Sequence, residues 1–95
     1  MNLPDLEQRM ESYCYEFAPN ERIEPGAEPY SRAIGQLGTL SVTPRTETSA
    51  VIQAGSASMP TRPLEWSFTT GDEWGMRRAA EHAIAFLRRA SRREE

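Results

Sequence analysis

The sequence predicts a two-layer α+β domain in which two helices pack on one face of a three-stranded antiparallel meander. Three observations lead to this prediction. Apolar residues recur with helical spacing near both ends of the chain, and three short runs between them have the composition and alternation of strands. The length of 95 residues suits one hydrophobic core, so residues 1–95 are treated as a single domain. The expected order is helix, strand, strand, strand, helix.

The first helix is expected over Leu3–Ala18. Pro4 suits the first helical turn, and Pro19 ends the pattern. Successive residues advance by about 100° around a helix, which defines one apolar stripe. The stripe contains Leu3, Leu6, Met10, Tyr13, Cys14 and Phe17. The next segment, Asn20–Ser31, has two prolines and a glycine among charged residues and is predicted to be a loop.

Three runs in the middle of the chain have the character of strands. Gly38–Thr43 alternates, with Leu40 and Val42 on one face. Ser49–Ala54 is apolar on both faces, which suits a central strand. Leu64–Thr69 alternates most regularly, with three large apolar residues on one face and polar residues on the other. The short connection between the first two runs predicts a hairpin, and therefore a meander.

The last quarter of the chain predicts a second amphipathic helix. Thr70 and Glu73 have the spacing of a capping box at its start. From Met76 onward the apolar side chains occupy one arc of about 160°, and the charged residues from Arg77 to Arg93 lie outside it. The arc contains Met76, Ala79, Ala80, Ala83, Ile84, Phe86, Leu87 and Ala90. We expect this arc to face the core, with the arginine stems bordering it and their charged ends in solvent.

Composition limits the class of protein. No apolar run approaches the roughly 18–20 residues that cross a bilayer, and the first residues lack the pattern of a secretory leader. We therefore expect a cytoplasmic protein that does not contact a membrane. The single cysteine, Cys14, excludes an internal disulfide and a multi-cysteine metal site. No metal or other cofactor is expected.

Residue types that carry catalysis are sparse. His82 is the only histidine and lies on the polar border of the last helix, where a solvated side chain is the simplest interpretation. Cys14 lies in the apolar stripe of the first helix, as a small buried residue would. The stretch Gly55–Ser58 lacks the lysine of a phosphate-binding loop. The sequence therefore predicts a protein that is not an enzyme.

The charges are distributed unevenly. Residues 1–30 carry a net charge of −5 and residues 76–95 carry +3, within a total of −3. The acidic first helix and several aromatic residues outside the apolar stripes predict a binding face for a partner with a basic surface. Its residues are Glu7, Glu11, Tyr15, Glu16, Tyr30 and Trp74. Each part of this prediction has an alternative. In one, the acidic surface binds no partner and only keeps the protein soluble. In the other, Trp74 folds back over the sheet and is not part of a binding face.

The leading functional hypothesis is a small accessory or inhibitor protein that acts by binding another protein. A compact scaffold without a chemical site fits such a role, and the protein would be encoded by a phage or mobile element, as anti-CRISPR and immunity proteins are. Another hypothesis is a homodimer that pairs exposed strand edges or helix faces.

The alternative hypothesis is a nucleic-acid-binding module that uses Arg78, Arg89 and Arg93 of the last helix. The expected element order and the sequence AAEHAI at Ala79–Ile84 resemble the double-stranded-RNA-binding domain and its AAxxAL signature. The resemblance implies a contact with duplex RNA through a lysine cluster before those alanines. At the matching positions this chain has Asp72–Met76, which includes two acidic residues and no lysine. The acidic net charge also differs from the basic footprint of a nucleic-acid binder.

Overall fold

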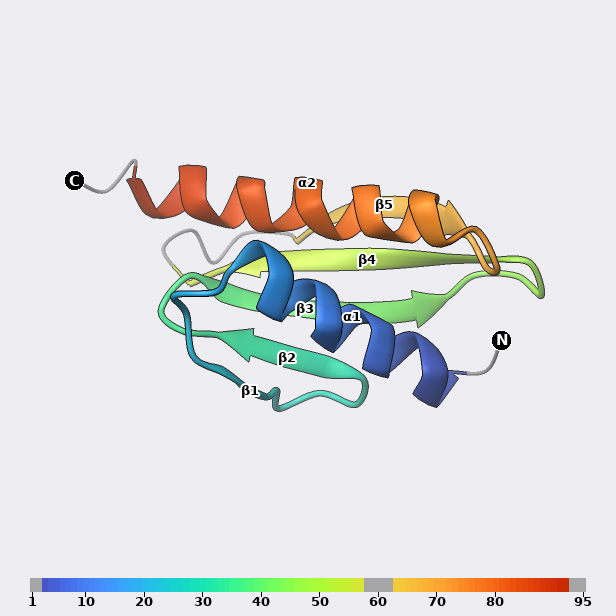
Figure 1. The fold of residues 1–95 in the computed structure, drawn as a ribbon, viewed down its shortest axis with the longest axis horizontal. Helices are drawn as coiled ribbons and strands as arrows, with labels where there is room; N and C mark the ends of the chain where they lie inside the picture. Colours follow the sequence, from blue (N-terminus) through green and yellow to red (C-terminus); the bar gives the residue numbers. More distant parts are fainter. Residues whose placement is uncertain (1–2, 58–62, 93–95) are drawn as a thin grey trace.

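The computed structural model describes residues 3–57 and 63–92. The described residues form two helices and five strands, so the predicted α+β class is confirmed. The strands make one antiparallel sheet in chain order, and both helices cover the same face of it (Figure 1). The elements are α1 (Leu3–Phe17), β1 (Ile23–Pro25), β2 (Ser31–Ile34), β3 (Gly38–Pro44), β4 (Ser49–Ser56), β5 (Leu64–Thr69) and α2 (Glu73–Arg92).

Two strands were not predicted. The prediction of a loop over Asn20–Ser31 is wrong for part of its length, because β1 lies inside it and β2 begins at its last residue. Strands of three and four residues are too short to carry an alternating pattern. In β2 the charged Arg32 also takes a position facing the helices, opposite Leu40 of β3, and this interrupts the apolar alternation. The three predicted strands become β3, β4 and β5 of a longer meander.

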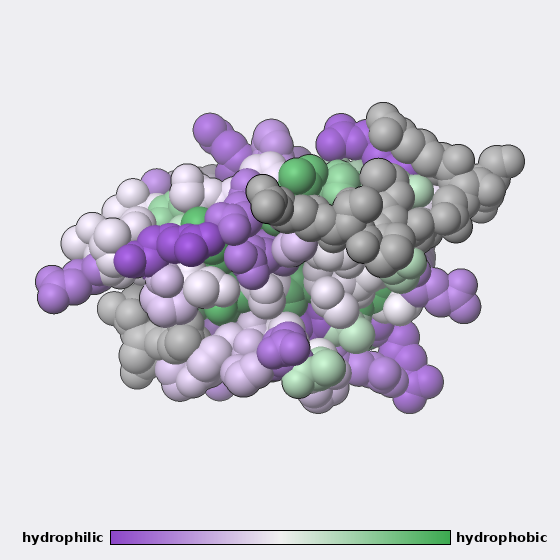
Figure 2. Space-filling view, turned by 180° about the vertical axis from the view of Figure 1, so that it is seen from behind, coloured by the Kyte–Doolittle hydropathy of each residue, from purple (hydrophilic) through white to green (hydrophobic). Residues whose placement is uncertain are grey.

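The sheet separates an apolar side from a polar side. Val42 lies opposite Ile52, and Ile52 lies opposite Trp66, so these three side chains form a row across strands β3, β4 and β5 on the face beneath the helices. The other face carries mainly hydroxyl and charged side chains, and Figure 2 shows it largely in hydrophilic and intermediate colours. The buried cluster on the helix side includes Leu6, Met10, Cys14, Ile34, Leu40, Val42, Ile52, Phe68, Ile84 and Leu87.

Helix α2 packs through the predicted apolar arc. Its alanines and Met76, Ile84 and Leu87 are buried along the arc, while Phe86 is half-buried. The predicted capping box is wrong, because α2 begins at Glu73 and its cap is Asp72. The Gly75 N–H donates to Oδ1 of Asp72 at 3.0 Å, an N-cap bond. Gly71, with a φ of 93°, makes the turn that brings Asp72 to this position. In the predicted capping box the Thr70 N–H would donate to the Glu73 side chain, but in the structure it donates to the Thr48 carbonyl.

Two glycines that meet across β3 and β4 give a matched test of this packing. A Cβ on Gly38, which has a φ of 150°, would lie 2.1 Å from the Gly55 carbonyl oxygen and 3.0 Å from Cδ2 of Leu87. A Cβ on Gly55 would meet only Oγ1 of Thr39, at 3.6 Å. We expect Gly38→Ala to lower the free energy of unfolding by about 2–4 kcal/mol, from backbone strain and overpacking. We expect Gly55→Ala to change it by less than about 1 kcal/mol.

Urea denaturation of the two variants checks this prediction. The two substitutions add the same methyl group to neighbouring strands, so the difference between them isolates the close approach of Gly38 to β4 and α2. Equal stability of the two variants would contradict the packing described here.

Candidate functional site

The two edges of the sheet differ in how they are protected. Edge strand β1 has three residues and contains Pro25, both of which discourage pairing with another chain. Edge strand β5 has six residues paired with β4 in one unbroken register, without a bulge or an internal proline. No further strand lies beyond β5 in the part of the chain that the structure describes. Among the described residues, the sheet therefore has one protected edge and one regular edge that no further strand covers.

The register identifies which backbone groups β5 presents at this edge. The Thr70 N–H donates to the Thr48 carbonyl at 2.9 Å, and hydrogen-bonded pairs in an antiparallel ladder recur at every second residue. Trp66 and Phe68 therefore bond to β4, whereas Glu65, Ser67 and Thr69 turn their N–H and C=O groups outward. The Thr69 carbonyl accepts the Asp72 N–H at 3.0 Å. Both backbone groups of Glu65 and of Ser67, and the Thr69 N–H, are left facing outward.

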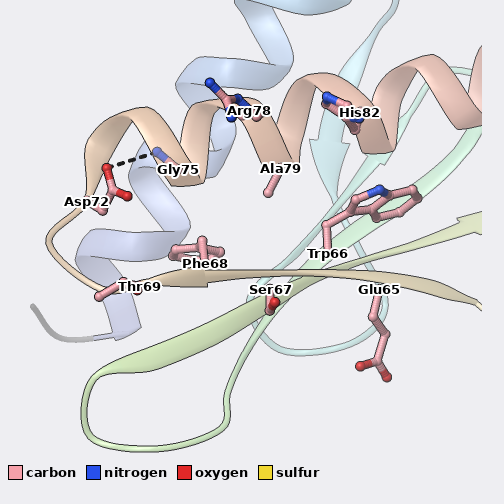
Figure 3. Close-up of a pocket in the computed structure, with 10 residues that line it drawn as sticks. All are labelled: Glu65, Trp66, Ser67, Phe68, Thr69, Asp72, Gly75, Arg78, Ala79 and His82. Carbon is pink, nitrogen blue, oxygen red and sulfur yellow. Dashed lines mark hydrogen bonds between the residues drawn. The ribbon is translucent and has the colours of Figure 1, made fainter.

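A groove follows this edge between β5 and α2. Its volume is about 580 Å³. Trp66 and Phe68 point from β5 toward α2, while Glu65 points to the opposite side of the strand (Figure 3). The lining residues are Glu65, Trp66, Ser67, Phe68, Thr69, Asp72, Gly75, Arg78, Ala79 and His82. The groove thus combines an apolar wall, a free strand edge and the polar side chains of α2, as peptide-binding grooves do.

The acidic side chains of the groove are already engaged. Asp72 caps α2 through the Gly75 N–H. Glu65 accepts hydrogen bonds from Arg45 at 2.6 Å and from Gln53 at 3.1 Å on the far side of the sheet. These hydrogen bonds lower the pKa of the Glu65 carboxyl, and the bond from Arg45 has the larger effect. Arg78, in contrast, is exposed and has no ion pair with another described residue.

The exposed side of α2 also carries the tryptophan singled out in the sequence. Of the two interpretations of Trp74, the structure supports exposure, because 79% of the residue is accessible. Trp74 precedes Arg78 by four residues, about one turn, so the two lie on the same side of α2. Trp66 is half-buried instead, and its ring packs against Phe86 with centroids 5.9 Å apart. Trp74 does not line the groove itself, but it lies one turn before Arg78, which does.

The carboxylates predicted to face a basic partner are paired with arginines of the same chain. Arg32, only 13% exposed, reaches from β2 beneath α1 to Glu11 at 2.7 Å and to Glu7 at 3.1 Å. Glu16 pairs with Arg77 of α2, whose guanidinium also lies over the Phe17 ring at 4.9 Å. These ion pairs fasten α1 to the sheet and to α2, and they leave the first helix with less free negative charge than its sequence implies.

The remaining predicted site residues are dispersed. Tyr15 is exposed on α1, whereas Tyr30 is half-buried against the core in the turn before β2, with a φ of 57°. Arg89 is exposed but lines a different hollow from Arg78, of about 360 Å³, beside Phe17 and Ile84. Arg93 lies outside the described residues. The six predicted partner-binding residues thus do not converge on one pocket, and neither do the two described arginines.

Cys14 and His82 lie in opposite surroundings, one buried and one exposed. Cys14 is fully buried in the core, and burial raises the pKa of its thiol to about 12. A protonated, inaccessible thiol is a poor nucleophile at neutral pH. His82 is exposed on α2 at the rim of the groove. Within residues 3–57 and 63–92, no group of three or more His, Cys, Asp or Glu side chains is arranged to hold a metal ion.

Comparison with known proteins adds no assignment. No family model, no curated protein and no solved structure matches this chain. The resemblance to the double-stranded-RNA-binding domain therefore rests on Ala79–Ile84 and on helices at both ends of an antiparallel sheet. In the described part of the chain, neither helix is both long and apolar enough to cross a membrane.

The unprotected edge of β5 is testable in the isolated protein. We expect the amide hydrogens of Trp66 and Phe68 to exchange slowly with solvent, because they bond to β4. We expect those of Glu65 and Ser67 to exchange faster by about tenfold or more, although they lie in the same strand. Residue-resolved hydrogen exchange by NMR measures all four. Uniform protection along β5 would contradict the assignment of a free edge.

The buried thiol of Cys14 gives a pH-dependent prediction. In the unfolded chain the thiol loses its proton near its usual pKa of 9, whereas the folded protein holds it until about 12. Between these values the unfolded state binds fewer protons, so the free energy of unfolding falls as pH rises, by at most about 1.4 kcal/mol per pH unit. The Cys14→Ala variant lacks this dependence.

Urea denaturation of the wild type and Cys14→Ala between about pH 7 and pH 10.5 makes this comparison. The stability difference between the two proteins should be constant up to about pH 8 and then shift against the wild type. A difference that stays constant over the whole range would show that the thiol is solvated in the folded protein.

Proposed function

We propose that this domain is a non-catalytic protein-binding module that accepts an extended segment of its partner as an additional strand beside β5. The observation that carries the proposal is the regular edge of β5, where Glu65 and Ser67 present outward-facing backbone groups beside a groove of about 580 Å³. Binding of this kind obtains its affinity from main-chain hydrogen bonds and its selectivity from side-chain pockets.

The groove determines how such a segment would lie. Side chains alternate across a strand, so every second residue of the added segment would point toward α2, level with Trp66 and Phe68. These residues would contact the aromatic rings and Ala79. The residues between them would point to the polar face, beside Ser67 and Thr69. An accessory or inhibitor role is consistent with this mode of binding, since occupying a strand of the partner would restrain that segment.

The predicted site on acidic α1 is less well supported than the groove. Glu7 and Glu11 are paired with Arg32, and Glu16 is paired with Arg77. A basic partner would have to compete with these arginines. We therefore place the interface at β5 and α2. Of the predicted set, only Trp74 belongs to α2, where it lies between the groove residues Asp72 and Gly75 in the chain.

Nucleic-acid binding is the second candidate, and one observation favours it. Arg78 and Arg89 are exposed on α2, and their spacing of about three turns places them on the same side of the helix. The net charge of −3 and the separate surroundings of the two arginines weigh against a continuous phosphate-binding surface.

The Ser67→Pro variant tests strand addition. Proline removes the outward N–H of Ser67 and blocks pairing at the edge, but it leaves the bonds of Trp66 and Phe68 to β4 in place. Peptides of about twelve residues, selected on the wild-type domain from a random phage-displayed library, serve as probes. We expect Ser67→Pro to weaken their binding by about tenfold or more, measured by fluorescence anisotropy.

The matched control is Ser67→Ala, which removes the hydroxyl and keeps the N–H. It should bind the same peptides within about twofold of the wild type. Circular dichroism and urea denaturation check that both variants fold. If the library yields no binders, or if Ser67→Pro binds them as tightly as Ser67→Ala does, strand addition at β5 is refuted.

A further inference from the structure

We infer that the segment bound beside β5 is acidic, and that a carboxylate on one of its residues facing α2 is recognised by Arg78. This inference rests on the strand addition proposed above and names the chemistry of the partner. It follows from the distribution of charge around the groove, from the spacing of side chains on the added strand and from the poor fit of a second copy of the chain.

The groove has one cationic and one anionic side chain without an ion pair among the described residues, and they lie in different places: Arg78 projects from α2, whereas Asp72 lies at the N-cap of α2, where the helix dipole favours a negative charge. Arg78 lines the groove and has no ion pair within the described part of the chain. The Asp72 carboxylate is held by the Gly75 N–H, and the Glu65 carboxylate is held by Arg45 and Gln53. Figure 3 shows Glu65 on the far side of the strand from the helix, and Arg78 and His82 on the helix itself. A bound carboxylate would meet a guanidinium without displacing an existing pair.

The alternation of the added strand brings a side chain to Arg78. Residues of the segment that lie level with Trp66 and Phe68 point toward α2 and are two positions apart. One of them would cover the apolar surface formed by Phe68 and Ala79. The other would project toward the polar rim of the groove, where Arg78 forms a charge-assisted hydrogen bond with its carboxylate. The expected pattern is an acidic and an apolar residue separated by one residue.

A second copy of this chain fits the same edge poorly. Antiparallel pairing of β5 with β5 of another copy would place two α2 helices over neighbouring strands of one continuous sheet. Each copy would then bring its own Arg78 to the groove at the shared edge. Like charges at an interface cost binding free energy, whereas a segment with a carboxylate neutralises the same position. The groove therefore favours an acidic partner over self-association.

The library selection described above tests this inference when it is repeated on Arg78→Glu and Arg22→Glu. The control, Arg22→Glu, makes the same charge reversal next to β1, at the opposite edge of the sheet, where Arg22 is exposed and pairs with Glu24. We expect wild-type and Arg22→Glu domains to enrich peptides with Asp or Glu two positions from an apolar residue. We expect Arg78→Glu to lose this enrichment and to select Lys or Arg at that position.

Affinities of the selected peptides give the quantitative result. Replacement of the acidic residue by its amide, and the Arg78→Glu substitution, should each weaken binding by about tenfold, while Arg22→Glu changes it less than about twofold. The effect of Arg78→Glu should shrink as salt rises from about 50 mM to 500 mM. Peptides without acidic enrichment, or equal effects of the two charge reversals, would overturn the inference.

The outcomes also separate this inference from the proposed function. If Ser67→Pro abolishes peptide binding but Arg78→Glu leaves it unchanged, strand addition holds and the acidic preference is wrong. If Ser67→Pro leaves binding unchanged, strand addition itself is wrong.

Duplex RNA and duplex DNA are tested as competitors of the peptide at about 150 mM salt. If either displaces the peptide, and if this displacement is lost in Arg78→Glu, Arg78 is assigned to phosphate binding instead. A dimer of the free domain in light scattering, lost on Ser67→Pro, would assign the edge to a second copy.

Discussion

The close packing of α2 on β4 and β5 is the interaction on which the rest of the molecule depends. Ala79, Ala80 and Ala83 are buried between the helix and the sheet. Small side chains allow the helix backbone to lie near the strands, and Ile84 and Leu87 fill the core beyond them. Gly38 meets the same requirement from the side of the sheet, because its α-carbon has no room for a side chain beneath Leu87. This packing also fixes the distance between α2 and β5, and therefore the width of the groove.

Ion pairs position α1 against the sheet and against α2. Arg32 projects from β2 to two carboxylates one turn apart on α1, and Arg77 and Arg9 join α1 to α2 through Glu16 and Glu73. The more exposed pairs, Arg9–Glu73 and Arg77–Glu16, contribute little stability individually, at most about 1 kcal/mol, whereas the Arg32 side chain is only 13% exposed. Their clearer effect is on the surface. They neutralise the acidic helix, and they leave Arg78 as a cation whose charge is directed outward at the edge of the sheet.

The sequence was sufficient for the features that depend on local periodicity. The apolar arc of α2, the stripe of α1 and the strand Leu64–Thr69 follow from spacing alone, and all three are present, although in this strand Phe68 is buried, Trp66 is half-buried and Leu64 is exposed. Strand β1 was missed because three residues are too few to show an alternating pattern, and β2 was missed because it is short and Arg32 occupies a position that an apolar residue usually fills. The cap of α2 was misplaced because Thr70 and Asp72 both precede the helix, and the turn at Gly71 decides between them.

The candidate site could be predicted only in part, because it depends on order across the sheet. LEWSFT identifies β5 as a strand, but only the complete sheet shows that β5 is an edge and that its outward groups belong to Glu65 and Ser67. The unequal edges set a limit on assembly. Growth of a continuous sheet from one molecule to the next requires two competent edges, and here β1 is short and contains proline. If a partner segment joins at β5 as proposed, it would therefore be the last strand of the sheet, and the expected product is a one-to-one complex and not a growing polymer.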